Sequence, residues 1–163
     1  GLKRVETFAD VKPWDNKILL WQRPHDTLRN SEANMAHQFR IAFNHVVKQK
    51  AWTLWFDECK YMSEKLGLQR EITYCLEQLR SVKGTTISGA QRPVWLPRSV
   101  LSNSTHVFLW STTDREDARR LSDIGGIDSK ELAAHAKQLG KHEFIYVHTR
   151  GTESRMIRSQ VGK

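Results

Sequence analysis

The chain has 163 residues, 39% of them hydrophobic and 27% charged, which is enough for one domain with a substantial core. The 26 lysines and arginines exceed the 18 acidic residues and give a formal net charge of +8. This charge favours polyanionic partners such as nucleic acid or nucleotides, but charge alone does not distinguish them from a solvated basic surface. Two cysteines, seven histidines without metal-ligand spacing and the lack of a long apolar stretch exclude a disulfide framework, a zinc site and a membrane-spanning helix. We therefore expect a cytoplasmic protein without a secretory leader.

The first half of the chain alternates between strand and helix patterns. Apolar residues recur at helical spacing from Met35 to Val47, and Asn30 or Ser31 can cap the start of this helix. A short alternating piece and two apolar runs predict strands on either side of it. These strands span residues 4–8, 17–21 and 52–58. The strand–helix–strand order predicts a βαβ unit and hence a parallel sheet.

The second half continues the alternation. A helix is predicted over residues 68–82, stopped by Gly84, and the next strands follow at 85–90 and 105–110. Capping boxes at Thr113 and Asp128 open two further helices, and the last strand covers residues 143–149. Together these elements predict an α/β fold with a mostly parallel central sheet of about five strands flanked by helices. We expect one domain over residues 1–150 and a basic, mobile or partner-facing tail over 151–163.

Two adjacent acids, Asp57 and Glu58, end the apolar run of residues 52–58. Ligands of open α/β sheets bind beyond the carboxyl ends of the strands, so these acids suggest a magnesium–nucleotide site. Asp57 would orient the metal through its water shell, and Glu58 would take a proton from the attacking water. The alternative is that an acid simply marks the exit of the strand into solvent.

Further along the chain, Gln91 follows the next strand and is a neutral group suited to read a γ-phosphate or to position water. Its alternative role is hydrogen bonding within a proline-containing loop. Arg80 and Arg119 are candidates to reach nucleotide phosphates, including those of a neighbouring subunit. The alternative for each arginine, and for Arg115 and Arg120 beside Arg119, is a solvent-facing charge paired with a nearby acid.

Aromatic residues are concentrated in the predicted strands. Four tryptophans there are expected to pack in the core, and only Trp95, in a proline-rich loop, is a candidate for an exposed contact. The four are Trp21, Trp52, Trp55 and Trp110. Cys59 directly follows the acids, but no histidine follows it at a recognisable spacing, so we interpret it as a small buried side chain rather than a nucleophile.

The order of these pieces resembles the FtsK/HerA superfamily of DNA-pumping ATPases, which includes conjugation and viral genome-packaging motors. Trp-Thr-Leu-Trp-Phe-Asp-Glu at 52–58 looks like a Walker B strand, Gly-Ala-Gln-Arg-Pro at 89–93 is similar to the sensor segment, and Asp-Arg-Glu-Asp at 114–117 resembles a following helix start. The resemblance implies a three-layer RecA-like sandwich, with Asp57 serving Mg²⁺, Glu58 as general base and Gln91 as sensor of the ATP γ-phosphate. It also implies double-stranded DNA as partner and a homo-oligomer, a hexameric ring, as the active form.

The chain departs from this family in two places. Ala90 stands where the family has threonine, and no G-x-x-x-x-G-K-[S/T] loop occurs in the sequence. We expect that loop upstream of Gly1, so the chain looks like the C-terminal part of an ATPase domain, inactive by itself and with apolar surface left for a partner or missing segment to cover. The alternative is a non-catalytic nucleic-acid-binding or assembly module with a degenerate ATPase fold.

Overall fold

A computed structural model describes residues 1–20, 27–150 and 155–162. These residues form two compact units, Gly1–Gly89 (unit 1) and Ala90–Lys163 (unit 2), and each is described by itself. Within the described residues, no helix is both long enough and apolar enough to cross a bilayer. The whole is a mixed α/β structure, as predicted, but its sheets are short and only partly parallel.

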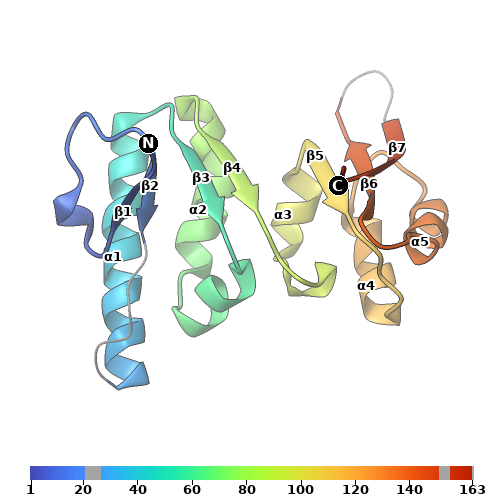
Figure 1. The fold of residues 1–163 in the computed structure, drawn as a ribbon, viewed down its shortest axis with the longest axis horizontal. Coiled ribbons are helices and arrows are strands. Elements are labelled where there is room, and N and C mark those ends of the chain that lie inside the picture. The colour runs from blue at the N-terminus through green and yellow to red at the C-terminus, as the bar shows by residue number, and fades with distance from the viewer. Residues whose placement is uncertain (21–26, 151–154, 163) are drawn as a thin grey trace. The chain divides into compact units, whose positions relative to one another are not determined.

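Unit 1 contains two small parallel sheets (Figure 1). Strand β1 (Lys3–Val5) pairs with β2 (Ile18–Leu20), and β3 (Thr53–Phe56) pairs with β4 (Thr85–Ser88). The predicted strands are thus confirmed in place, although shorter than expected. The helical elements of this unit are η1 (Phe8–Asp10), α1 (Leu28–Gln49), the π-helix η2 (Tyr61–Lys65), α2 (Gln69–Gln78) and η3 (Leu79–Val82).

Helix α1 begins earlier than the sequence predicts. Its N-cap is Thr27, whose hydroxyl accepts a hydrogen bond from the Asn30 N–H at 3.4 Å, so the expected cap at Asn30 or Ser31 is wrong. Its buried stripe includes Phe43, whose ring meets that of Phe56 on β3 edge-on, with centroids 5.7 Å apart. This contact joins α1 to the strand that ends at the two acids.

Unit 2 contains one antiparallel sheet of three strands. Strand β5 (His106–Leu109) pairs with β6 (Glu143–His148), which pairs with β7 (Arg155–Gln160). The expected parallel sheet of about five strands is not formed by the described residues. Two helices, rather than the single crossover helix typical of a parallel pair, separate β5 from β6. Residues 155–160 of the expected mobile tail are an ordered strand.

The helices of unit 2 are α3 (Arg98–Asn103), α4 (Arg115–Arg120) and α5 (Ser129–Lys137), with short 3₁₀ turns η4 (Pro93–Trp95) and η5 (Leu121–Asp123). The predicted cap of α5 is confirmed, because Asp128 accepts the N–H groups of Lys130 and Glu131 at 2.8 and 2.9 Å. The predicted cap of α4 is off by one residue, because Asp114 rather than Thr113 caps it. The positive end of each helix dipole also stabilises the acidic side chains at these two positions.

Among the described residues of unit 2, helices cover one face of the sheet. Leu109, Ile145 and Val147 project from that face into the core. The other core residues come from the helices and the turns next to them, and are Leu101, Leu121, Ile124, Leu132, Ala136 and Leu139. The opposite face carries exposed aromatic side chains.

Two tryptophans that were expected in the core are exposed, because helices cover one face of their strands. Trp55 on β3 is 71% exposed and Trp110 after β5 is 52% exposed, whereas both were expected in the core. Their apolar strands have one face covered rather than two. Trp52 and Trp95 are half-buried, so Trp95 is less exposed than expected, and Trp21 lies outside the described residues.

Candidate functional site at the end of strand β3

The carboxyl ends of β3 and β4 lie side by side. In their parallel register Phe56 is opposite Ser88, and the Gly89 N–H donates to the Phe56 carbonyl at 2.9 Å. The Cys59 N–H then donates back to the Gly89 carbonyl at 3.2 Å. Asp57 and Glu58 therefore occupy the turn directly beyond two paired parallel strands, which is where α/β sheets bind ligands.

Glu58 has a strained backbone. Its φ is 50°, in the left-handed region that residues with a β-carbon rarely adopt. Its carbonyl accepts the Met62 N–H at 3.2 Å, which ties the turn to the start of η2. Such strain is found preferentially at functional sites, where the surrounding structure holds it in place. Nothing in the sequence signals this conformation, because the residue is not a glycine or an asparagine.

Asp57 is exposed and lies beside the Gly89 backbone, where a β-carbon would be 3.7 Å from its Oδ1 atom. Among the described residues no three His, Cys, Asp or Glu side chains gather to form a complete metal cage. Magnesium in nucleotide sites is held by one or two carboxylates together with phosphates and water, so a lone carboxylate at a strand end fits that ion. Asp57 would hold such an ion, and the phosphates would supply the remaining charge.

Gln91 is exposed and is the second residue of unit 2. The residue after it, Arg92, is held by two acidic side chains. The Arg92 Nε donates to Asp117 Oδ2 at 3.0 Å, and its Nη2 lies 2.9 Å from Asp114 Oδ1. The Val94 N–H donates to the other Asp117 oxygen at 3.1 Å. Asp117 is 3% exposed, so one buried carboxylate anchors the two residues that flank Pro93.

These contacts have electrostatic consequences at the start of α4. The backbone N–H groups of Glu116 and Asp117, helped by the Arg92 guanidinium, hold the pKa of the Asp114 carboxyl below its ordinary value. The hydrogen bond to Asp117 and the nearby Asp114 raise the pKa of Arg92. The sequence analysis missed Asp117 as an anchor, although the acidic helix start at 114–117 was the available signal.

The two arginine candidates lie in different units of the chain. Arg80 lies in η3, before the first residue of β4, whereas Asp57 and Glu58 follow the last residue of β3. Within unit 1 it is therefore at the opposite end of the parallel pair. Arg119 is an exposed residue of α4 in unit 2. Its neighbour Arg120 pairs with a nearby acid, Asp123, at 3.1 Å, but the two side chains are 26% and 7% exposed, so this pair is part-buried rather than solvent-facing as expected.

Cys59 and Cys75 are buried free thiols, and burial raises the pKa of each to about 11. At pH 8 only about one in a thousand of either thiol is then ionised. We expect neither cysteine to react with a thiol-specific disulfide reagent at pH 8 until urea unfolds unit 1. Because the folded pKa is raised, stability falls as pH rises above the ordinary thiol value near 9. Rapid labelling of Cys59 in the native protein would contradict its assignment as a buried, unreactive side chain.

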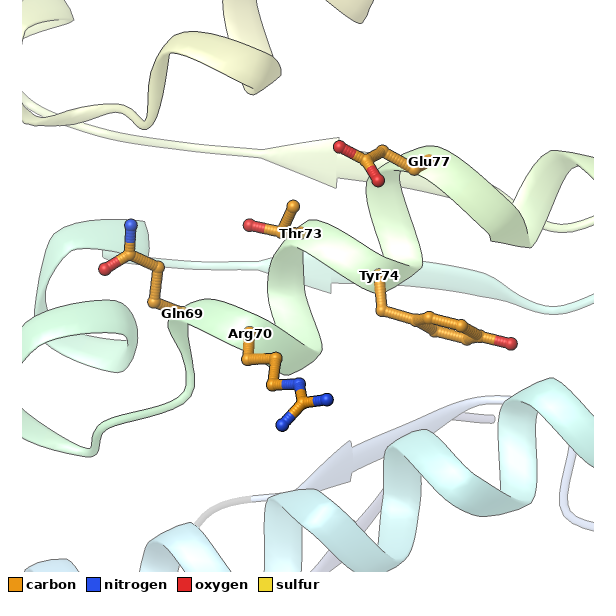
Figure 2. Close-up of a pocket in the computed structure, with 5 residues that line it drawn as sticks. All are labelled: Gln69, Arg70, Thr73, Tyr74 and Glu77. Carbon is orange, nitrogen blue, oxygen red and sulfur yellow. The ribbon is translucent and has the colours of Figure 1, made fainter.

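A shallow depression lies elsewhere in unit 1, along the outer surface of α2. It is lined by Gln69, Arg70, Thr73, Tyr74 and Glu77. All five side chains come from one helix and do not converge on a common point (Figure 2). None of them is a predicted site residue, and the depression lacks the enclosure typical of a small-molecule site.

Comparison with known proteins shows similarity of fold. No known protein-family profile matches the chain, and no curated protein sequence does. The genome-packaging NTPase B204 of Sulfolobus turreted icosahedral virus 2 is similar in its complex with AMPPCP, at a TM-score of 0.69 and 16% identity, over 99% of this chain and 74% of that one. Its complex with AMP gives a TM-score of 0.65 at 18% identity, over 94% and 72% of the two chains. At such identities the likeness establishes a shared fold.

Proposed function

We propose that this chain is the Walker B and sensor part of an ATP-dependent motor that moves double-stranded DNA. The observation that carries the proposal is the strained Glu58, which follows Asp57 directly beyond the carboxyl ends of β3 and β4. Asp57 holds Mg²⁺ and Glu58 accepts a proton from the attacking water. The fold shared with a packaging NTPase that binds AMP and AMPPCP supports this assignment.

The remaining parts of the mechanism come from other residues. Gln91 senses the γ-phosphate. The segment that carries it is anchored within unit 2 by the hydrogen bond from Arg92 to Asp117. Arg80 and Arg119 are candidates to contact the phosphates of a neighbouring subunit in a hexameric ring. Arg80 lies at the end of the parallel pair opposite to Asp57 and Glu58, and Arg119 lies in unit 2. The phosphates themselves need a glycine-rich loop with its lysine, and the sequence contains none.

The decisive experiment measures nucleotide binding and ATP turnover with Mg²⁺. The 163-residue chain alone is expected to show no turnover, and a form combined with a G-x-x-x-x-G-K-[S/T] loop, on the same polypeptide or on an added partner, is expected to hydrolyse ATP. In that form Glu58→Gln should lower turnover at least about 100-fold while nucleotide binding is retained, since it removes the base alone.

The matched control is Glu64→Gln, which changes an exposed glutamate of η2, six residues after Glu58, and should leave turnover unchanged. Turnover retained in Glu58→Gln would refute the role of Glu58. Turnover by the isolated chain on the order of 1 s⁻¹ or faster would refute the need for the phosphate loop.

The second candidate is a non-catalytic nucleic-acid-binding or assembly module, which the net charge of +8 favours. It predicts salt-sensitive binding of duplex DNA without nucleotide, because cationic side chains release counterions from phosphates. If such binding occurs and no loop-bearing form hydrolyses ATP, this candidate replaces the motor.

A further inference from the structure

The uncovered face of the sheet in unit 2 is lined by aromatic rings, and we call it the aromatic face. The antiparallel register places His106 opposite His148 and Phe108 opposite Tyr146. Trp110 continues the row, its ring centroid 5.9 Å from that of Phe144. On β7 the same face is completed by Arg155, Ile157 and Ser159, which are opposite His148, Tyr146 and Phe144.

The six rings of this face form one contiguous surface. His106 stacks on His148 at 5.1 Å and on Tyr146 at 6.0 Å, and its Nδ1 is 2.9 Å from the Tyr146 hydroxyl. The Phe108 ring lies 5.2 Å from that of Tyr146 and 5.8 Å from that of Phe144. Phe108 and Trp110 are 54% and 52% exposed, so about half of each side chain remains accessible to solvent. Contiguous exposed apolar side chains of this kind are a candidate binding surface.

The chemistry of the aromatic face restricts its occupant. Its nine residues include no carboxylate, and its edge carries the Arg155 guanidinium and the imidazoles of His106 and His148. A purely apolar protein helix or lipid surface would bury these polar groups without partners, which costs free energy. A polyanion with flat rings satisfies both kinds of group, through stacking on the aromatics, contact of a phosphate with the Arg155 guanidinium and hydrogen bonds to the polar groups.

We propose that the aromatic face binds single-stranded nucleic acid. Bases stack on Phe108, Trp110 and the β6 rings, while Arg155 contacts the backbone phosphates. Duplex DNA is a poor ligand there, because its bases are already stacked on one another and expose only their edges in the grooves. The face lies within unit 2 and uses neither Asp57 nor Glu58, so the proposal is independent of nucleotide hydrolysis.

The experiment titrates the 163-residue chain into a fluorescent 20-nucleotide oligo(dT) and a duplex of equal length, without nucleotide and at two salt concentrations. We expect the single strand to bind more tightly. Phe108→Ala and Trp110→Ala should each weaken its binding about five- to hundredfold, the range that loss of a base–aromatic stack produces. Trp14→Ala removes a 77% exposed tryptophan in unit 1 and should bind like the unchanged chain.

A second measurement on the unchanged protein covers the case in which a variant does not fold. Photocrosslinking of an iodouracil-substituted oligonucleotide should label peptides that contain residues 106–110 or 143–148. Three results would each overturn the proposal. They are crosslinks confined to unit 1, equal losses of oligonucleotide binding in Phe108→Ala, Trp110→Ala and Trp14→Ala, and tighter binding of the duplex than of the single strand. So would concentration-dependent self-association that Phe108→Ala abolishes without any oligonucleotide binding, because the face would then bind a second copy of the chain.

Discussion

Replacement of Phe56 by alanine is expected to lower the free energy of unfolding of unit 1 by about 3–5 kcal/mol. Phe56 is 1% exposed on β3, and its ring packs edge-on against Phe43 of α1. Removal of the ring leaves a cavity between the helix and the strand that carries the acids. Urea denaturation followed by circular dichroism measures the loss, and amide hydrogen exchange assigns it to residues 1–89.

Trp55→Ala is the matched control for this prediction. Trp55 is adjacent on the same strand, but its side chain is 71% exposed, so its truncation should cost far less than that of Phe56. If Phe56→Ala leaves no folded unit 1 to titrate, Phe56→Leu should show a smaller loss in the same direction. Equal losses for Trp55→Ala and Phe56→Ala would mean that both faces of β3 are covered.

Asp117→Asn is expected to destabilise unit 2 by about 2–4 kcal/mol. Asp117 accepts hydrogen bonds from Arg92 on one oxygen and from the Val94 N–H on the other. The amide turns one acceptor into a donor, so either the guanidinium or the backbone N–H faces another donor in a buried place. The loss should appear in urea denaturation, together with faster amide exchange at residues 92–95.

Asp114→Asn provides the comparison, because Asp114 also contacts Arg92 but is exposed. Asparagine is as good an N-cap as aspartate, so this variant keeps the start of α4 and loses only a solvent-screened charge pair. Its effect should be clearly smaller than that of Asp117→Asn. Similar losses of stability from both substitutions would show that charge pairing of the carboxylates with Arg92, rather than the buried hydrogen bonds of Asp117, stabilises unit 2.

Local sequence patterns predicted most elements of the fold but not the pairing of its strands. Apolar runs, one alternating piece and one β-prone segment predicted the strands from β1 to β6. Asp128 was identified correctly as a cap because the capping interaction is local. The orientation of β6 depends on where the chain returns after α4 and α5, which no local pattern specifies. Trp55 and Trp110 show the same limit, since an apolar strand does not reveal whether one or both of its faces are covered.

For the candidate site, the sequence placed Asp57 and Glu58 at the strand end where the structure has them. The roles of these two acids, of Gln91 and of the arginines stay predictions. The left-handed backbone of Glu58 and the anchoring of Arg92 by Asp117 were beyond sequence reasoning. The anchoring depends on hydrogen bonds between residues far apart in the chain, and the turn at Glu58 is followed by the hydrogen bond from the Cys59 N–H to the Gly89 carbonyl.

The conformation of Glu58 also bears on how this sequence would change under laboratory evolution. A residue with a β-carbon at φ 50° lowers stability by roughly 1 kcal/mol or more, whereas asparagine or glycine adopts that conformation readily. A library selected for thermal tolerance alone would therefore drift away from glutamate at position 58. Retention of glutamate would require a selection in which the carboxylate itself is needed, so the outcome of two parallel selections would separate folding from function at a single residue.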